Sequence, residues 1–398
     1  MVVVGGLGPT HDAFLAAALS GTGVHAIALD TTSSRAEAEG RRLLSRGHPA
    51  TLYQQAGALV LAVTGVGEPI AFFTFGEHCA YHADAFRRAL ANAAIANAHV
   101  RALIMEDALR SVGSGDVEGT ARRAAAIRAC LRAVVVADVL ECLACFHRPR
   151  VAVPEVVDER VGATARAIED ALRHGRDTTV TLRTLAATLA RLPRGEPRAP
   201  RVEAWLTGEV RSGLSRSTEV VRILRTLEAL GACVRPMTAT EWLLQQVGTV
   251  SALTEARRAR LSLLLQATWH RAAAHVGLGG TLLIDPAVIA EHAGQHYPRI
   301  LRGSSEHTEV GTYLLLDREG RTDIVVSLKP FASVTSSAVS DAVLYQLARD
   351  RRTGFVALEL HGDAAAMTDS RLELAVDLAA RRRRSGFASR TDRDAVHV

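Results

Sequence analysis

A short polar segment, Glu77-His78-Cys79 followed by His82, carries the side chains of this chain best suited to chemistry. It comes directly after the apolar run Ala71 to Phe75 and before a run of helical period, so it lies where a strand passes into a helix. Open α/β sheets bind ligands at the carboxyl ends of their strands, and a helix N-terminus lowers the pKa of a thiol. Sulfur and imidazole nitrogen also bind zinc and iron. This position suits a metal site or a reactive thiolate, and a catalytic Cys-His pair is a further alternative; the favoured interpretation is a group of inactive polar residues with Cys79 packed or idle.

Two other groups have the spacing of chemical motifs. Cys142 and Cys145 are separated by two residues, as in redox motifs, but they lie in an Ala- and Leu-rich stretch of helical period, which favours packing in the core. His292 and His296 are four residues apart and can share a helix face as metal ligands, although Gly294 interrupts that face.

Glycines follow two predicted strands. The turn Gly5 to Gly8 resembles half of a dinucleotide-binding fingerprint, and Asp30 ends the second strand near the place of a ribose-binding acid. A nucleotide site therefore remains an alternative. The pair Gly208-Glu209 ends a later strand, where the carboxylate of Glu209 can contact a substrate or the other domain, or can simply fix the turn into the next helix.

The elements that position these groups alternate along the first part of the chain. Short apolar runs are separated by longer segments of helical period, which is the pattern of a parallel sheet covered by helices. Strands are predicted at Val2 to Val4, His25 to Leu29, Ala71 to Phe75 and Val100 to Met105, and helices at Thr10 to Leu19, Arg35 to Leu44 and Ala83 to Ala96.

A helical stretch and a linker divide the chain. The sequence from Val117 to Leu192 has helical period almost throughout, and three prolines and a glycine follow within Leu192 to Pro200. After this linker, strands are predicted at Val202 to Leu206, Cys233 to Pro236, Tyr313 to Leu316, Ile324 to Val326 and Phe355 to Leu360, and helices at Ser217 to Leu230 and Ala252 to His275. The prediction is an α/β fold with two Rossmann-like domains, each a doubly wound parallel sheet, at residues 1–116 and 201–385, a helical insert at 117–192 and a tail at 386–398.

Several stretches share the motifs of one family. They are Gly208-Glu209 with Thr226-Leu-Glu-Ala-Leu-Gly-Ala-Cys-Val234 and Thr240-Glu-Trp-Leu243; Ala133-Val-Val-Val-Ala-Asp-Val-Leu140 with Arg148-Pro149; and Glu309-Val-Gly-Thr with Asp323-Ile-Val-Val, Lys329-Pro-Phe331 and Asp369-Ser-Arg-Leu-Glu373. Over residues 5–380 the chain resembles the activase-related and component proteins of 2-hydroxyacyl-CoA dehydratases. The resemblance implies tandem flavodoxin-like or Rossmann-like domains, a 4Fe-4S cluster and low-potential electron transfer in a 2-hydroxyacyl-CoA dehydratase system.

The chain departs from the family at its cluster ligands. His48 stands where relatives have a cysteine, Gly76-Glu77-His78-Cys79 replaces a Cys-Gly-Pro-Cys turn, and Ser333 ends a Pro330-Phe-Ala-Ser segment in place of Pro-Phe-Gly-Cys. A 4Fe-4S cluster takes four thiolates, or three with another ligand, and Cys79 alone remains at these positions. The resemblance therefore implies a changed metal site formed by Cys79, His78, His82 and His48, and cofactor contacts from Cys79, Glu209 and Ser333.

Composition limits the class of protein. A chain of 398 residues that is 48% apolar can form two or three domains with cores of their own, which excludes a disordered protein. No apolar run approaches the roughly 18 residues of a membrane span, and the first residues predict a strand rather than a signal peptide, so we expect a cytoplasmic protein with no membrane partner. Five cysteines, an odd number, argue against a disulfide framework. The basic run Arg381 to Arg384 predicts a solvated helix end, and no nucleic-acid partner is expected.

The leading interpretation is an altered, noncatalytic relative of the activase-related proteins. It would bind a 2-hydroxyacyl-CoA dehydratase-type partner subunit or an acyl-CoA-like ligand. A second interpretation is a working iron-sulfur or other metal-dependent enzyme of the same family that uses Cys79 with His48, His78 or His82. A third, a dinucleotide-binding oxidoreductase, depends on the glycine turn alone.

Overall fold

The protein is an α/β protein, mostly helical, with two parallel sheets. The structure is a computed structural model that describes residues 1–31, 33–74, 80–96, 98–101, 117–195, 202–209, 213–214, 218–249, 254–278, 283–297, 305–330, 340–360 and 365–384. The α/β class predicted from the sequence is confirmed at this level.

The first sheet is formed by four parallel strands in the order β2-β1-β3-β4. We call this sheet and its helices the N-lobe. Its strands are β1 (Val2–Gly5), β2 (Ala26–Ala28), β3 (Ile70–Thr74) and β4 (Ala98–Arg101), and its helices are α1 (Pro9–Ser20), α2 (Ser34–Leu43), α3 (Ala50–Val63) and α4 (Ala80–Asn92). Val3 and Phe72 of the two central strands pack with α2, α3 and α4 in one core cluster.

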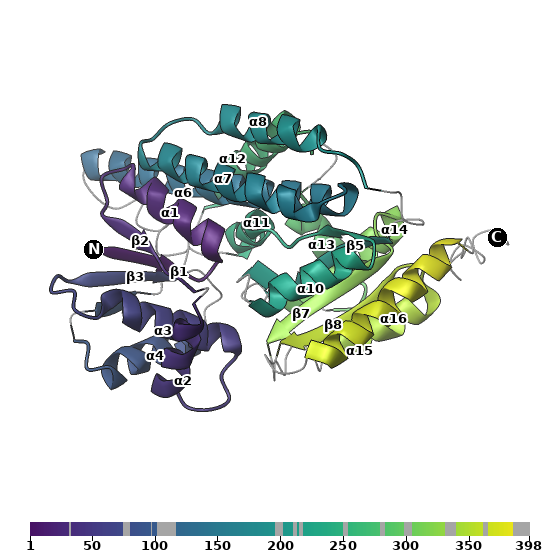
Figure 1. The fold of residues 1–398 in the computed structure, drawn as a ribbon, viewed down its shortest axis with the longest axis horizontal. Coiled ribbons are helices and arrows are strands. Elements are labelled where there is room, and N and C mark those ends of the chain that lie inside the picture. The colour runs from purple at the N-terminus through teal and green to yellow at the C-terminus, as the bar shows by residue number, and fades with distance from the viewer. Residues whose placement is uncertain are drawn as a thin grey trace.

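The second sheet repeats the same strand order, β6-β5-β7-β8, and is again parallel. We call it and its helices the C-lobe (Figure 1). The strands are β5 (Val202–Gly208), β6 (Ala232–Arg235), β7 (Ile324–Pro330) and β8 (Gly354–Leu360). One face is covered by α10 (Thr218–Ala229) and α16 (Ala365–Arg384), and the other by α13 (Pro286–Ala293), α14 (Ser305–Glu319) and α15 (Asp341–Asp350).

A layer of helices extends from the N-lobe to the C-lobe (Figure 1). Its helices are α6 (Val117–His147), the short 3-10 helix η2 (Arg148–Arg150), α7 (Pro154–Arg173), α8 (Thr179–Ala190), α11 (Ala239–Thr249) and α12 (Glu255–His275). The layer shares one core with the N-lobe, and Cys145 of α6 packs in a core cluster of the C-lobe. Its buried side chains, among them Val135, Leu185 and Trp269, form a single cluster with Phe14 and Leu15 of α1. The helical stretch therefore packs as a shared layer and has no core of its own.

Most predicted elements overlap with observed ones, and one prediction is wrong. Tyr313 to Leu316, predicted as a strand, lies inside the helix α14. All four of these side chains are buried, so the segment carries no alternation or one-sided stripe that distinguishes a strand from a helix. The basic run Arg381 to Arg384 forms the last turn of α16, which confirms the predicted helix end. Residues 102–105 of the fourth predicted strand and 196–200 of the linker lie outside the described residues.

No helix in the described ranges combines the length and the apolar composition that a membrane crossing requires.

Glycines allow α2 and α3 to touch backbone to backbone. A Cβ atom on Gly57 would lie 1.8 Å from the carbonyl oxygen of Ala36, and one on Gly40 would lie 1.9 Å from that of Tyr53. Both distances are far inside van der Waals contact, and the obstacle in each case is backbone, which cannot rotate away. The close pairing of these helices therefore requires glycine at both positions.

We expect Gly57→Ala to destabilise the protein by about 2 kcal/mol, because the added methyl group forces α2 and α3 apart. Gly162→Ala is the matched control: Gly162 lies in α7, and a Cβ there would meet only the end of the Arg166 side chain, at 3.9 Å. This change should stabilise the protein by about 0.5–1 kcal/mol through helix propensity. Thermal unfolding of both variants measures the difference, and equal effects would contradict the close-contact explanation.

Candidate functional site

The carboxyl edges of the two sheets point toward the boundary between the lobes (Figure 1). In each sheet the first strand, β1 or β5, pairs with the second strand on one side and the third on the other. The chain therefore adds the second strand on one side of the first strand and the third strand on the opposite side. Ligands of open parallel sheets bind at the carboxyl edge at this switch point. The β1–β3 edge and the β5–β7 edge are thus the two candidate sites.

At the C-lobe edge, Glu209 follows β5 directly. Gly208 has a φ of 121°, and a Cβ there would lie 2.1 Å from the carbonyl oxygen of Leu328, so the close approach of β5 and β7 requires glycine. The Glu209 amide donates a hydrogen bond to the same oxygen at 2.9 Å. Glu209, which is half-buried, is thereby held at the switch point. It lies next to Leu328 of β7, the residue before Lys329.

A buried ionic cluster lies at the end of β7. The Lys329 ammonium donates to Ser340 Oγ at 3.1 Å and to the Asp341 carboxylate, and lies 3.4 Å from Glu309 Oε2. Ser327 donates to the same Glu309 oxygen at 3.0 Å. Ser327 and Lys329 share one face of β7 because side chains alternate along a strand, and α14 and α15 cover that face. Two carboxylates therefore surround one ammonium in the interior.

The cluster holds a proton near neutral pH. Burial raises the pKa of Glu309 to about 7, opposed by the charge of Lys329 and the hydrogen bond from Ser327. Burial also raises the pKa of Asp341. Glu309 Oε1 is buried and has no hydrogen-bond partner among the described residues. The cluster can therefore donate or accept a proton, and it adds no net positive charge to this edge.

At the N-lobe edge, the glycine turn binds a carboxylate of its own chain. Asp12 accepts hydrogen bonds from the amides of Gly6, Leu7 and Gly8 at 3.1, 3.2 and 3.3 Å. Burial raises the pKa of Asp12 to about 6. In dinucleotide-binding folds the amides of this turn face a pyrophosphate. Here the same donors are used by Asp12, so the turn offers no open anion site.

A buried carboxylate joins the lobes between these two edges. Asp138 of α6 lies 2.8 Å from His11 Nε2, at the start of α1. It also accepts hydrogen bonds from the amide and hydroxyl of Thr240 at 2.7 and 2.6 Å and from the amide of Ala239 at 2.9 Å, at the start of α11. His11, Asp138 and Thr240 are all buried. One carboxylate thus fixes α6, α1 and the N-terminus of α11 to one another.

The described cysteines are distributed over α6 and β6 and do not gather at either edge. Cys142 and Cys145 are buried inside α6, which confirms the core-packing interpretation, and Cys145 Sγ accepts a hydrogen bond from Arg148 at 3.2 Å. Burial raises the pKa of Cys142, and it raises that of Cys130, also in α6, to about 12. Cys233 is the second residue of β6 and is buried. Cys142, Cys145 and Cys233 are thus buried, and burial favours the neutral thiol at Cys130 and Cys142.

The proposed metal ligands lie largely outside the described residues. This holds for Glu77, His78, Cys79 and Ser333, and for the side chain of His82 in α4. His48 is described: it precedes α3, is half-buried, and its ring packs edge-on against Tyr53. Burial, and then the charge of Arg88 on α4, lowers its pKa.

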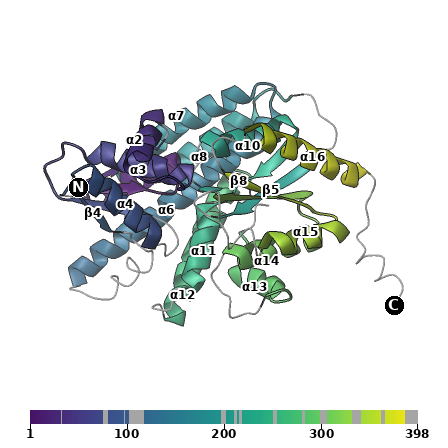
Figure 2. The same ribbon diagram turned by 90° about the horizontal axis from the view of Figure 1, so that it is seen from below.

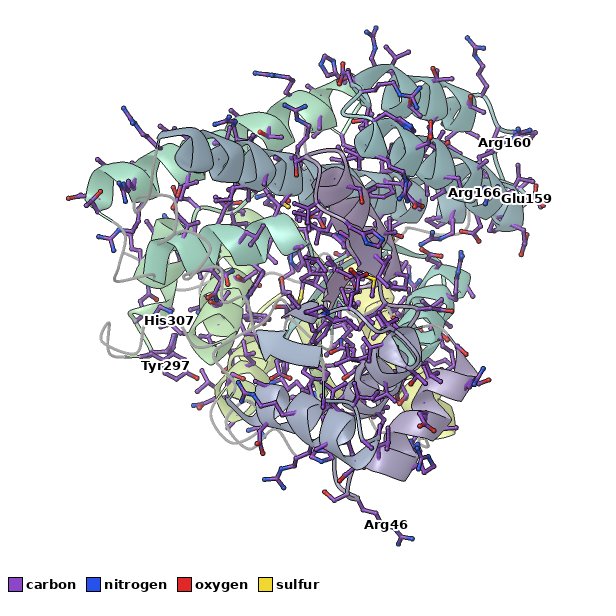
Figure 3. The ribbon with its side chains drawn as sticks, turned by 90° about the vertical axis from the view of Figure 1, so that its left-hand side faces the viewer. Arg46, Glu159, Arg160, Arg166, Tyr297 and His307 are labelled. Atoms are coloured by element: carbon purple, nitrogen blue, oxygen red, sulfur yellow. The ribbon has the colours of Figure 1, made fainter. Side chains whose placement is uncertain are left out.

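The second histidine pair is separated by the end of a helix. His292 lies in α13, and its Nδ1 is 2.9 Å from the carbonyl oxygen of Val288, whereas His296 follows the helix. Figure 3 shows His307 of α14 beside Tyr297, with ring centroids 6.4 Å apart. Within the described ranges, no three His, Cys, Asp or Glu side chains are arranged to hold a metal ion.

Sequence reasoning named some of these residues without their partners. Four of them belong to separate motifs of the sequence. In the structure, Asp138 contacts Thr240, and Glu309 contacts Lys329. A charged residue within an apolar run was the available signal, because a buried charge needs a partner. Asp12 gave no such signal.

The fold and the site define an α/β protein in which two parallel sheets turn their carboxyl edges, lined by buried charged groups, toward one another. The sequence matches no known family model and no curated protein sequence.

We expect Asp138→Ala to lower the free energy of unfolding by about 3–5 kcal/mol, because it leaves His11 and two amides at the start of α11 buried without their acceptor. Hydrogen exchange at Ala239 and Thr240 should rise at the same time. Asp170→Ala is the control, because this aspartate forms only exposed ion pairs and its removal should cost no more than about 0.5 kcal/mol. Comparable losses in the two variants would show that Asp138 does not join the lobes.

The Glu309 cluster predicts a pH dependence. The folded protein holds the Glu309 proton more tightly than the unfolded chain, with a pKa of about 7 against 4.5. Relative to Glu309→Gln, the wild type should therefore be most stable below about pH 4.5 and lose up to about 3 kcal/mol as the pH rises to about 7. Denaturant unfolding at a series of pH values measures this difference, and a difference that does not change with pH would refute the raised pKa.

Proposed function

We propose that this protein is a two-lobed relative of the activase-related and component proteins of 2-hydroxyacyl-CoA dehydratases that acts by binding rather than by electron transfer. Each lobe is a doubly wound, Rossmann-like unit in this proposal. The ligand is an acyl-CoA-like thioester at the sheet edges, and a partner subunit uses the bound ligand. The position of the described cysteines is the observation that carries the proposal.

A 4Fe-4S cluster does not fit the described thiols. Such a cluster takes three or four thiolates that converge on one point. Three of the described cysteines lie along α6, and Cys233 lies near the start of β6. Burial favours the neutral thiol at Cys130 and Cys142. Cys79, outside the described residues, is the one cysteine left for an edge, and one thiolate does not hold such a cluster.

The scaffold supports kinship with the family. Residues that carry the resemblance contact one another across the chain: Arg148 binds Glu228 at 2.8 Å, and Thr226 donates to Asp369 at 3.2 Å. Asp138 binds Thr240 in the same way. These contacts join η2 to α10, α10 to α16, and α6 to α11. The residues shared with the family thus hold the framework together, which accounts for their retention in a chain that has lost cluster ligands.

The charges at the C-lobe edge suit the acyl end of the ligand. Glu209 at the tip of β5 can accept a hydrogen bond from an α-hydroxyl group. Lys329 is balanced by Glu309 and Asp341, so the diphosphate of the cofactor gains no attraction there. We therefore place the hydroxyacyl group, and not the nucleotide, beside Glu209.

A ligand-induced shift in thermal stability tests the proposal. A 2-hydroxyacyl-CoA should raise the melting temperature of the wild type, because a ligand that binds only the folded state stabilises it by about 2.7 kcal/mol at 100 times its Kd. The matching acyl-CoA without the hydroxyl group should act more weakly, and NAD should have no effect. Glu209→Gln should reduce the response to the hydroxyacyl ligand at least about tenfold. Glu159→Gln, on the outer side of α7 (Figure 3), should leave it unchanged.

Iron analysis provides the opposing outcome. After anaerobic incubation with iron and sulfide, the wild type and Cys79→Ser should contain the same small amount of iron. Four irons per chain in the wild type and their loss in Cys79→Ser would overturn the binding proposal in favour of electron transfer. A thermal shift with NAD but none with the thioester would overturn it in favour of a dinucleotide-binding protein.

A further inference from the structure

The helix α12 presents an exposed face with two leucines at its centre. Leu263 is 65% exposed and Leu264 is 38% exposed, whereas Leu265, Trp269 and Ala273 of the same helix are buried. At 3.6 residues per turn, both exposed leucines lie on the side of the helix opposite to the buried residues. The two adjacent leucines therefore form a small exposed apolar area on a side of α12 that does not face the core.

Arginines lie on both sides of these leucines. Arg257 and Arg260 precede them, and Arg271 follows them; all three are exposed and lie on the same face. The distance along the axis from Arg257 to Arg271 is about 21 Å, or four turns of helix. We call the five residues Arg257, Arg260, Leu263, Leu264 and Arg271 the α12 face.

The charge of the α12 face is not balanced within the described part of the chain. Glu255, before the face, is the one acidic residue of α12, and the three arginines form no ion pair with a described carboxylate. Some exposed arginines on other helices are paired locally, such as Arg173 with Glu169 at 2.7 Å on α7 and Arg381 with Asp377 at 2.8 Å on α16. The α12 face is therefore a region of uncompensated positive charge around an apolar centre.

The position of α12 makes this face accessible. Figure 2 shows α12 extending to the edge of the molecule, next to α11. Residues 254–260, at the start of the helix, are exposed except for the half-buried Arg258. A partner can thus approach along the whole length of the face without a change in the fold.

We infer that the α12 face docks an acidic amphipathic helix of a partner protein. Two apolar side chains in the partner would cover Leu263 and Leu264, and carboxylates before and after them would pair with Arg260 and Arg271. Exposed leucines at the centre are covered by a protein helix, whereas a nucleic-acid backbone offers them no apolar contact. Two leucines within a basic face are too small an apolar area for a helix that lies in a membrane interface. The inference is independent of the ligand proposed at the sheet edges.

A designed peptide tests this docking. The probe is a fluorescein-labelled 21-residue helix with leucine at i, i+3, i+4 and i+7 spacing and glutamate at most other positions. The control peptide has the same composition with its leucines distributed around the helix. Fluorescence anisotropy with the full chain at low salt should show binding of the amphipathic peptide and at least about tenfold weaker binding of the control, and added salt should weaken the complex.

Matched variants locate the contact. Leu263→Ser with Leu264→Ser should weaken peptide binding at least about tenfold, and Arg260→Ala with Arg271→Ala should weaken it and reduce its salt dependence. The control, Leu374→Ser with Leu378→Ser, changes two leucines of α16 that are 61% and 46% exposed, and it should leave binding within about twofold of the wild type. All three variants should keep the circular dichroism spectrum and the thioester response of the wild type.

Three results would overturn the inference. Equal binding of the two peptides would show attraction by charge alone, and an equal loss in the α16 control would place the contact elsewhere. The protein could also bind phosphatidylserine vesicles. If the peptide did not compete with this binding and the α12 leucine variant abolished it, the face would be assigned to a membrane surface. An unchanged thioester response in an α12 variant that no longer binds peptide would show that the two proposals stand separately.

Discussion

The arrangement of this protein depends on the buried carboxylate of Asp138. It accepts hydrogen bonds from the start of α11 and contacts His11 at the start of α1, and it lies on the helix that passes between the two sheets. A buried charge is tolerated only when its partners are in place, and breaking such a set costs several kcal/mol. Asp138 thereby holds α6, α1 and the start of α11 together next to the carboxyl edges at which the proposed ligand binds.

The sequence predicted the strands better than the contacts between distant residues. Apolar runs such as Val2 to Val4 and Phe355 to Leu360 correspond to β1 and β8, because strands buried on both faces are apolar throughout. The same rule produced the error at Tyr313 to Leu316, where a helix is also buried on every side. The Asp138–Thr240 contact spans 102 residues, and no local pattern contains such a pairing. The burial of Lys329 depends on how α14 and α15 pack over β7, which no apolar run along the chain reveals.

The two lobes share one strand order but treat charge differently at their edges. In the N-lobe, Asp12 uses the amides of the glycine turn, so the chain itself supplies the anion that this turn favours. In the C-lobe, Glu309 and Asp341 surround Lys329, and Glu209 stands beside them at the end of β5. The same strand order thus carries two chemically unlike edges, and the difference lies in side chains near the strand ends.

The burial of Lys329 has a consequence for the chemical stability of the protein. Arginine accounts for 46 of its 47 basic residues, and the one lysine is fully buried. Activated thioesters slowly acylate free amines, and they do so through the neutral form of the amine, which a guanidinium does not provide at physiological pH. The thioester ligand proposed above would therefore meet no exposed lysine, and the one ε-amine is shielded by Glu309, Asp341 and the packing of α14 and α15.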